Sequence, residues 1–366
     1  MNKIFSITRI CVLLFFALSF GNVLQAQNSL NIQSASVDSL LKWMNSGRKA
    51  EQIPLFADLP ANQLMEQLLK ENDKVGLSFK EALQKFSAND SVSGNLYLLN
   101  DAYAKRAAIA DLLPAIKNNE FSSSLYRRVL IYFPPKYVPT REYNVFLSAT
   151  GWQWGDAMTF GYKTSGDKWK LTDKGTPAII FNLTLVSKLY GKTTTERLEV
   201  LKNVMSHELF HAIFADYAKA NHHYKKQKDI TSEAFHIMLD EGMAHYISDW
   251  HMVWDNYSKG DKLKTKEKEA FSQLSDSAKV IFNTTLPDSV RRNAMQSGTF
   301  GPYWKKYMCI PSLFMAYHIE KELGVDELRK CIKKGPEYFI KKYKTLCRRH
   351  NELPSLPREL LVKRKK

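Results

Sequence analysis

Hydrophobic residues recur every three or four positions over much of the chain, and this spacing predicts helices. The first half carries the pattern in four stretches, at residues 37–44, 60–69, 78–86 and 96–113. The last stretch stops before Pro114, because proline lacks the backbone N–H that a helix interior needs. We expect these helices to pack together as an N-terminal layer.

The pattern changes at Pro134 and Pro135, since two consecutive prolines forbid a regular helix. Runs of β-branched and aromatic residues follow at 143–149 and 177–182, and they predict two strands. Strands that lie between a helical region and another long helix are typical of a mixed α and β architecture. The sequence therefore predicts an α+β protein that is predominantly helical.

A long amphipathic helix is predicted at residues 193–217. Thr193 and Glu196 have the spacing of a capping box, in which each side chain accepts a hydrogen bond from the backbone of the other. Apolar residues then recur at intervals of three or four, at Leu198, Leu201, Met205, Leu209 and Ala212. One face of this helix is therefore expected to be buried.

His207, Glu208 and His211 lie on this helix in the order His-Glu-x-x-His. Residues at positions i and i+4 project from the same face of a helix, so the two imidazoles converge. Neutral imidazole is a good zinc ligand, and two of them leave room for a third protein ligand and a water. Glu208 is placed to take a proton from a water that the metal acidifies and to pass it to a leaving amine. The motif therefore predicts Zn²⁺ as cofactor and Glu208 as catalytic base.

A second helix, predicted at residues 231–250, can supply the third ligand. Glu241 is the natural candidate, because the chain after His211 is long enough to finish the first helix, form a loop and return. Gly242 follows directly, and its missing side chain would let the two helices approach closely.

The combination of His-Glu-Leu-Phe-His with a downstream Glu-Gly-x-Ala-x-Tyr segment resembles the gluzincin metallopeptidases, the group that contains thermolysin and the aminopeptidase N type enzymes. It is most similar in character to little-characterised bacterial families of zinc-dependent peptidases. The resemblance covers about residues 177–250. It implies Zn²⁺ held by His207, His211 and Glu241, with Glu208 as general base, and a peptide or protein substrate.

Thermolysin-like enzymes carry an aspartate four residues after the third ligand, whereas this chain has His245 there and Asp240 and Asp249 nearby. Either aspartate could orient a ligand imidazole. His245 shares the face of Glu241 and is a candidate for a role at the site. An oxyanion that forms during hydrolysis also needs a donor, and Tyr303, which follows a Gly-Pro turn and opens a C-terminal helical pattern, is our candidate catalytic residue for that role.

Residues 1–26 have the pattern of a secretory signal. Lys3 and Arg9 precede an apolar run at 10–20, and the segment ends at Ala26. This run is too short to span a bilayer, and no later segment has the required length. We therefore expect an exported protein, periplasmic or secreted, without an integral membrane segment once the signal is removed.

The 366 residues include 53 Lys and Arg against 37 Asp and Glu, which gives a net charge of +16. Basic runs at 262–268 and 363–366 carry no nucleic-acid-binding motif, so we interpret them as solvated faces and expect no nucleic acid partner. Three cysteines follow the signal, Cys309, Cys331 and Cys347. Three thiols exclude a disulfide-stapled scaffold and are expected to be small core residues.

The sequence divides into a signal peptide at 1–26, an N-terminal helical region at 27–131, a zincin-like catalytic core at 132–252 and a C-terminal helical region at 253–366. The core holds the metal helix and the third-ligand helix. The favoured function is an exported zinc metallopeptidase of the gluzincin type. Two alternatives stay open, a binding protein that retains the metal without catalysis and an exported binding protein without metal.

Overall fold

The structure, a computed structural model, describes residues 30–72, 76–90, 95–139, 141–153, 155–172, 174–224 and 229–361. The predicted signal at 1–26 and the basic run at 363–366 lie outside these residues. The described chain forms two compact units. One contains the chain up to Arg127 together with Pro139–Leu201, and the other contains Arg128–Val138 together with the chain from Lys202 onward. The predicted sequence regions at 27–131, 132–252 and 253–366 stay predictions.

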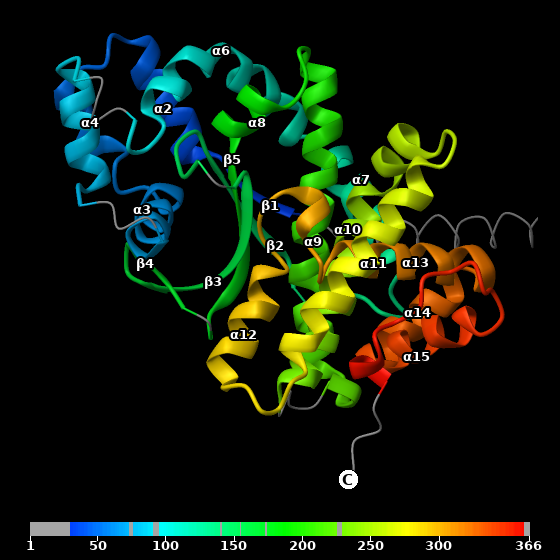
Figure 1. Cartoon of the computed structure of the whole chain (residues 1–366). Helices are drawn as coiled ribbons and strands as arrows, with labels where there is room; N and C mark the ends of the chain where they lie inside the picture. Colours follow the sequence, from blue (N-terminus) through cyan, green and yellow to red (C-terminus); the bar gives the residue numbers. More distant parts are fainter. Residues whose placement is uncertain are drawn as a thin grey trace, which may run out of the picture. The chain divides into compact units, whose positions relative to one another are not determined.

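A mixed sheet of five described strands forms the centre of the first unit (Figure 1). Its order is β1 (Leu30–Gln33), β2 (Tyr143–Ser148), β5 (Thr176–Asn182), β3 (Ala157–Ser165) and β4 (Lys168–Leu171). β1, β2 and β5 run parallel, whereas β3 is antiparallel to both β5 and β4.

The two predicted strands are β2 and β5, and they pair with Val145 opposite Ile179. Most of their side chains are buried, including successive residues such as Ile180 and Phe181. Burial on both faces explains their continuous apolar runs, which made them visible in the sequence. β1, β3 and β4 were not predicted, because they are short or contain exposed and half-buried polar residues.

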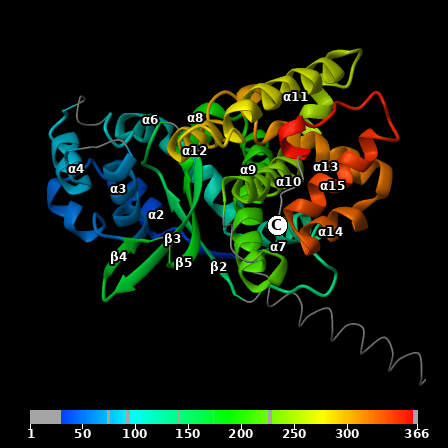
Figure 2. The same ribbon diagram turned by 60° about the horizontal axis from the view of Figure 1, so that its bottom comes forward.

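The predicted N-terminal helices are present as α2 (Ala35–Asn45), α3 (Pro60–Asn72), α4 (Phe79–Ser87) and α6 (Leu99–Ile116). A 3-10 helix, η1 (Ala50–Leu55), packs against α4. α3 lies against β4 and β2, and α2 lies against β2, as Figure 2 also shows for α3 and β4. The helices therefore pack on the sheet as well as on each other, and they form part of the core of this unit.

The predicted end of α6 before Pro114 was wrong. The helix contains Pro114 and continues to Ile116. Leu112 and Ile116 on either side of the proline are fully buried, so their packing offsets the hydrogen bond that the proline cannot donate. The next helix, α7 (Asn119–Leu130), was not predicted, although Phe121, Leu125 and Val129 are buried at helical spacing.

α8 (Leu183–Leu189) packs on α6 and is followed by the long helix α9 (Thr194–Ala220), which passes from the first unit into the second. The predicted capping box at its start is confirmed. The backbone N–H of Glu196 donates to Thr193 Oγ1 at 3.2 Å, and the backbone N–H of Thr193 donates to Glu196 Oε2 at 3.0 Å. Gly191 has a φ of +63°, which lets the chain turn into this cap.

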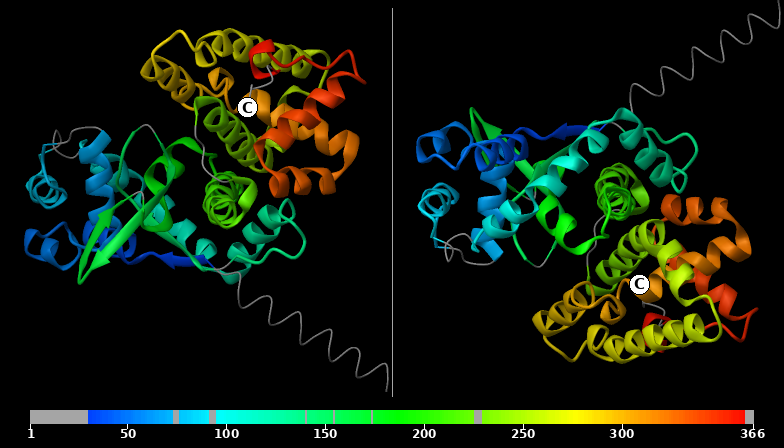
Figure 3. Two further views of the ribbon diagram at one scale, coloured as in Figure 1. Left: turned by 90° about the horizontal axis from the view of Figure 1, so that it is seen from below. Right: turned by 90° about the horizontal axis from the view of Figure 1, so that it is seen from above.

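Helix α10 (Ile230–Tyr257) is the central helix of the second unit. It begins with a capping box between Asp229 and Ser232. Around it pack α11 (Lys262–Ile281), α12 (Asp288–Ser297), α13 (Ile310–Leu323) and α15 (Pro336–Cys347), with α14 (Val325–Lys334) between the last two. Figure 3 shows the orange helices grouped with the yellow-green α10. Short 3-10 helices are η2 (His222–Tyr224), η3 (Tyr303–Lys305) and η4 (Arg358–Leu361).

Gly242 permits a close helix contact, but the partner is α13. A Cβ on Gly242 would lie 2.4 Å from the Cβ of Ser312 and 2.9 Å from its carbonyl carbon. The prediction that Gly242 lets the two metal-site helices approach closely was therefore wrong. The glycine instead lets α10 pack closely on α13. This contact fixes the position of Glu241, the residue that precedes Gly242 on α10.

The predicted fold class is confirmed, because the chain is predominantly helical with one small mixed sheet. The helical pattern that opens at Tyr303 forms only the short η3 there, and α13 begins at Ile310. Cys309 and Cys331 are buried, Cys347 is partly buried, and all three are free thiols. In the part of the chain that the structure describes, no helix combines the length and apolar character needed to cross a membrane.

Candidate metal centre

Helices α9 and α10 bring the three predicted ligands together within the second unit. The Nε2 atoms of His207 and His211 lie 3.0 Å apart. Glu241 places Oε2 3.9 Å from His207 Nε2 and Oε1 3.9 Å from His211 Nε2. The side chain of His207 is 17% exposed, that of His211 is 15% exposed and that of Glu241 is 25% exposed. The cluster is therefore partly accessible to solvent and is not covered by apolar side chains. Figure 2 shows the two helices beside one another.

The opposite side of α9 explains why these polar groups stay in place. Leu209, Phe210, Ala212 and Ile213 are fully buried, so they anchor the helix around the motif. Phe210 also stacks on Phe214 one turn later. The buried stripe fixes the rotation of α9, and that rotation turns His207 and His211 toward α10.

Each predicted imidazole ligand has a polar partner on its other ring nitrogen. His211 Nδ1 lies 2.7 Å from Oδ1 of Asp240. His207 Nδ1 lies 3.4 Å from Oγ of Ser248, whose hydroxyl donates to Asp249 at 2.6 Å. Such partners fix the orientation of a histidine and leave its Nε2 free to bind a metal. Asp240, one of the two aspartates considered for this role, is therefore placed to orient the ring of His211.

His245 also faces this cluster. Its Nδ1 lies 2.6 Å from Asp249 Oδ2, and its Nε2 lies 3.8 Å from Glu241 Oε2. The ring makes an angle of 68° with that of His207, with centroids 4.6 Å apart. One ligand atom each from His207, Glu241 and His245 lie within 4.8 Å of one another. His245 was absent from the predicted ligand set, although its place four residues after Glu241 was the signal that could have included it.

Burial and the neighbouring charges shift the pKa values of the clustered residues in different directions. Burial and the neighbouring His245 and His211 hold the pKa of His207 well below its usual value. Burial also opposes the charged form of His211, but the carboxylates of Asp240 and Glu241 outweigh it and raise its pKa to about 10. For Asp249, burial would raise the pKa, yet the hydrogen bond and charge of His245 lower it.

The residues present fit a zinc ion. Nitrogen and oxygen ligands about 2.0–2.2 Å from one ion in tetrahedral geometry lie about 3.4 Å apart. The separations of 3.0 and 3.9 Å between the ligand atoms fall on either side of this value. Two imidazole nitrogens face each other at 3.0 Å, and a carboxylate lies beside them. Such a set of nitrogen and oxygen ligands suits one divalent cation.

The two predicted catalytic residues lie at different parts of the centre. Glu208 is half-buried on α9, and its charge contributes to the raised pKa of His211. Tyr303 lies in η3 with its ring perpendicular to that of His245, at a centroid distance of 5.8 Å. Burial of its hydroxyl and the charge of Asp249 hold the pKa of Tyr303 well above its usual value, so it stays a protonated donor.

Two residues near the centre were missed by sequence reasoning. The thiol of Cys309 donates to Glu241 Oε2 at 3.7 Å. Arg128, at the end of α7, donates to the backbone carbonyls of Ile247 and Ser248 and to the side chain of Asn203. Arg128 therefore links the end of α7 to both α9 and α10. No motif marks either residue, because each acts through a contact between distant parts of the chain.

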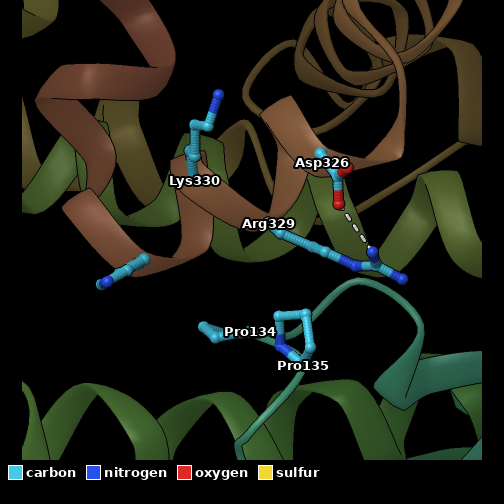
Figure 4. Close-up of a pocket in the computed structure, with 6 residues that line it drawn as sticks. Pro134, Pro135, Asp326, Arg329 and Lys330 are labelled. Atoms are coloured by element: carbon cyan, nitrogen blue, oxygen red, sulfur yellow. Dashed lines mark hydrogen bonds and ion pairs between the residues drawn. The ribbon is translucent and has the colours of Figure 1, made fainter.

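A hollow elsewhere in the second unit is lined mainly by prolines and basic residues, unlike the histidine and carboxylate cluster. It has a volume of about 320 Å³, and Figure 4 shows Arg329 paired with Asp326 across from two prolines. Its lining residues are Pro134, Pro135, Asp326, Arg329, Lys330 and Lys333. This hollow contains no histidine and only one carboxylate, so it does not offer a second metal site.

The fold and the site together define a predominantly helical protein in which histidines and a carboxylate form a candidate metal centre. The model of the family described as "Putative zinc dependent peptidase (DUF5700)" matches residues 53–352, and the chain belongs to this family. The matched segment contains both metal-site helices. No curated protein and no solved structure matches the chain.

Proposed function

We propose that this chain is a zinc metallopeptidase of the gluzincin type, with His207, His211 and Glu241 as metal ligands. The observation that carries the proposal is the convergence of two imidazole nitrogens, 3.0 Å apart, on the carboxylate of Glu241. Membership of a family described as zinc-dependent peptidases supports the same function.

His207, His211 and Glu241 would hold Zn²⁺, which would supply Lewis-acid chemistry by acidifying a water and polarising the carbonyl of a peptide bond. Glu208 follows the first ligand directly and accepts the proton from the attacking water. The same carboxyl group then passes the proton to the leaving amine. Asp240 and Ser248 keep the two imidazoles oriented while this happens.

Tyr303 is the proposed donor to the oxyanion that forms when water attacks the carbonyl. Its support is the raised pKa, which keeps the hydroxyl protonated, and its place beside His245. A neutral hydroxyl donor aimed at developing charge is a common source of stabilisation in hydrolases. Tyr303 therefore complements Glu208, which handles the proton.

The proposed location of this activity is outside the cytoplasm, in the periplasm or in secreted form. The charged, apolar and small-residue pattern of residues 1–26 supports it. The substrates would be peptides or proteins met in that compartment. Two alternatives are an exported protein that holds metal without catalysis and one that holds no metal.

One experiment separates these three functions. The zinc-loaded protein is incubated with a broad peptide library, then treated with a chelator, and then given zinc again. A peptidase cleaves, loses activity with the chelator and regains it with zinc. Stoichiometric zinc without any cleavage indicates the metal-retaining binding protein, and absence of zinc after metal loading indicates the metal-free one. Either of these two results overturns the proposal.

A further inference from the structure

His245 has the features of a metal ligand and not of a packing residue. Only 4% of the residue is exposed, yet its Nε2 makes no hydrogen bond in the described part of the chain. A buried polar atom without a partner is costly, so a native structure that contains one calls for an explanation. This nitrogen lies 3.8 Å from Glu241 Oε2, which belongs to the proposed metal site.

The other nitrogen of His245 is held as firmly as that of His211. Asp249 lies 2.6 Å from His245 Nδ1, and Asp240 lies 2.7 Å from His211 Nδ1. A carboxylate on one ring nitrogen is the usual arrangement around a histidine that binds metal through the other. The two aspartate–histidine pairs present their Nε2 atoms to the same carboxylate, that of Glu241.

We propose that His245 is a further ligand of the metal, so that the centre contains three imidazoles and one carboxylate. This inference rests on the proposed function. Its ligands are His207 and His211 from α9 and Glu241 and His245 from α10. His245 follows Glu241 by one helical turn, so α10 presents both ligands from one face.

This ligand set differs from the usual catalytic zinc site, which has three protein ligands and a water. Four protein ligands would complete a tetrahedral shell, so hydrolysis at this centre would require the shell to expand. Zinc sites reach five-coordination during catalysis. Because His245 adds a fourth protein ligand, we expect the centre to bind its metal more tightly than two histidines and a glutamate would.

X-ray absorption spectroscopy at the zinc edge of the zinc-loaded protein counts the imidazole ligands. Three imidazoles are expected for the wild-type protein and two for His245→Gln. The zinc affinity, measured by competition with a chromophoric chelator, is expected to fall about 100-fold or more, since loss of an outer-shell partner alone costs about 10- to 100-fold. The wild-type count tests the inference even where the variant does not fold.

His318→Gln is the matched control. His318 is a buried histidine of the same unit, with Nε2 2.6 Å from Glu267 Oε1, and it lies on α13. This variant is expected to keep three imidazoles and the wild-type affinity. Two imidazoles in the wild-type protein, unchanged in His245→Gln, overturn the inference and leave the proposed function intact. Failure of the wild-type protein to bind stoichiometric zinc overturns the proposed function itself.

Discussion

His211 Nδ1 lies 2.7 Å from Asp240 Oδ1, and this contact leaves Nε2 as the nitrogen of His211 that faces the proposed metal centre. Asp240 directly precedes Glu241, so one segment of α10 both carries a proposed ligand and contacts the imidazole of another. The two helices are thereby coupled at the centre through their side chains.

Replacement of Asp240 by alanine is expected to weaken zinc binding. The ring of His211 would lose the partner that fixes its orientation, and such losses reduce metal affinity about 10- to 100-fold. Chelator competition measures this. Asp276→Ala is the control, because Asp276 is a 73% exposed aspartate on α11. Equal zinc affinities of the Asp240→Ala variant and the wild-type protein would contradict the assigned role.

Gly242→Ala tests the contact between α10 and α13. The added Cβ would lie 2.4 Å from Ser312 Cβ and 2.9 Å from the Ser312 carbonyl carbon. Overpacking of this kind lowers the free energy of unfolding by about 1–3 kcal/mol. Denaturant unfolding measures it, with Gly76→Ala as control because nothing lies within 4 Å of a Cβ there. Alanine has a helix propensity about 1 kcal/mol more favourable than that of glycine, which partly offsets the loss. A free energy of unfolding that is unchanged or increased would show that α13 can move away from the added methyl group at little cost.

Glu327 is expected to make stability depend on pH. Its carboxylate accepts a hydrogen bond from Tyr338 at 2.7 Å and pairs with Lys330 at 3.0 Å and Lys342 at 2.7 Å. Burial alone would raise the pKa of Glu327, but these partners lower it from 4.5 to about 2. A lowered pKa stabilises the folded state above pH 4.5, and the contribution is lost as the pH falls toward 2.

Glu327→Gln should therefore lower the free energy of unfolding by about 3 kcal/mol at pH 7 and by progressively less below pH 4.5. Urea unfolding at several pH values measures the difference. Glu269→Gln serves as control, since Glu269 is 49% exposed in a surface ion pair. If the difference in free energy of unfolding between the wild-type protein and Glu327→Gln stays constant down to pH 2, the effect of Glu327 does not come from its charge.

Tyr303→Phe is expected to lower kcat with little change in KM. Loss of one oxyanion donor costs about 10²- to 10³-fold in kcat. The control is Tyr307→Phe, which removes a neighbouring hydroxyl that donates to the backbone carbonyl of Ala294. If the Tyr303→Phe variant has the kcat of the wild-type protein, Tyr303 does not act as the oxyanion donor.

The parts of this fold that local patterns determine could be predicted from the sequence. The start of α9 follows from Thr193 and Glu196, and the convergence of His207 with His211 follows from helical periodicity. β2 and β5 were visible because they are buried on both faces. Glu241 could be selected because the number of residues after His211 allows a returning helix.

Features that depend on packing between distant segments could not be predicted. α6 continues through Pro114 because buried neighbours outweigh the local cost. The close partner of Gly242 is Ser312, 70 residues later in the sequence, so no local pattern identifies it. The contact of Arg128 with α10 and the direction of His245 Nε2 likewise depend on the assembled second unit.

The most direct test of the account compares Glu208→Gln with the wild-type protein for both zinc content and peptide cleavage. The substitution keeps the size of the side chain and removes the base, so zinc binding should be unchanged. General-base catalysis contributes about 10²- to 10⁴-fold, and the cleavage rate should fall by that factor. A variant that keeps its zinc and cleaves peptides at the wild-type rate would contradict the proposed mechanism.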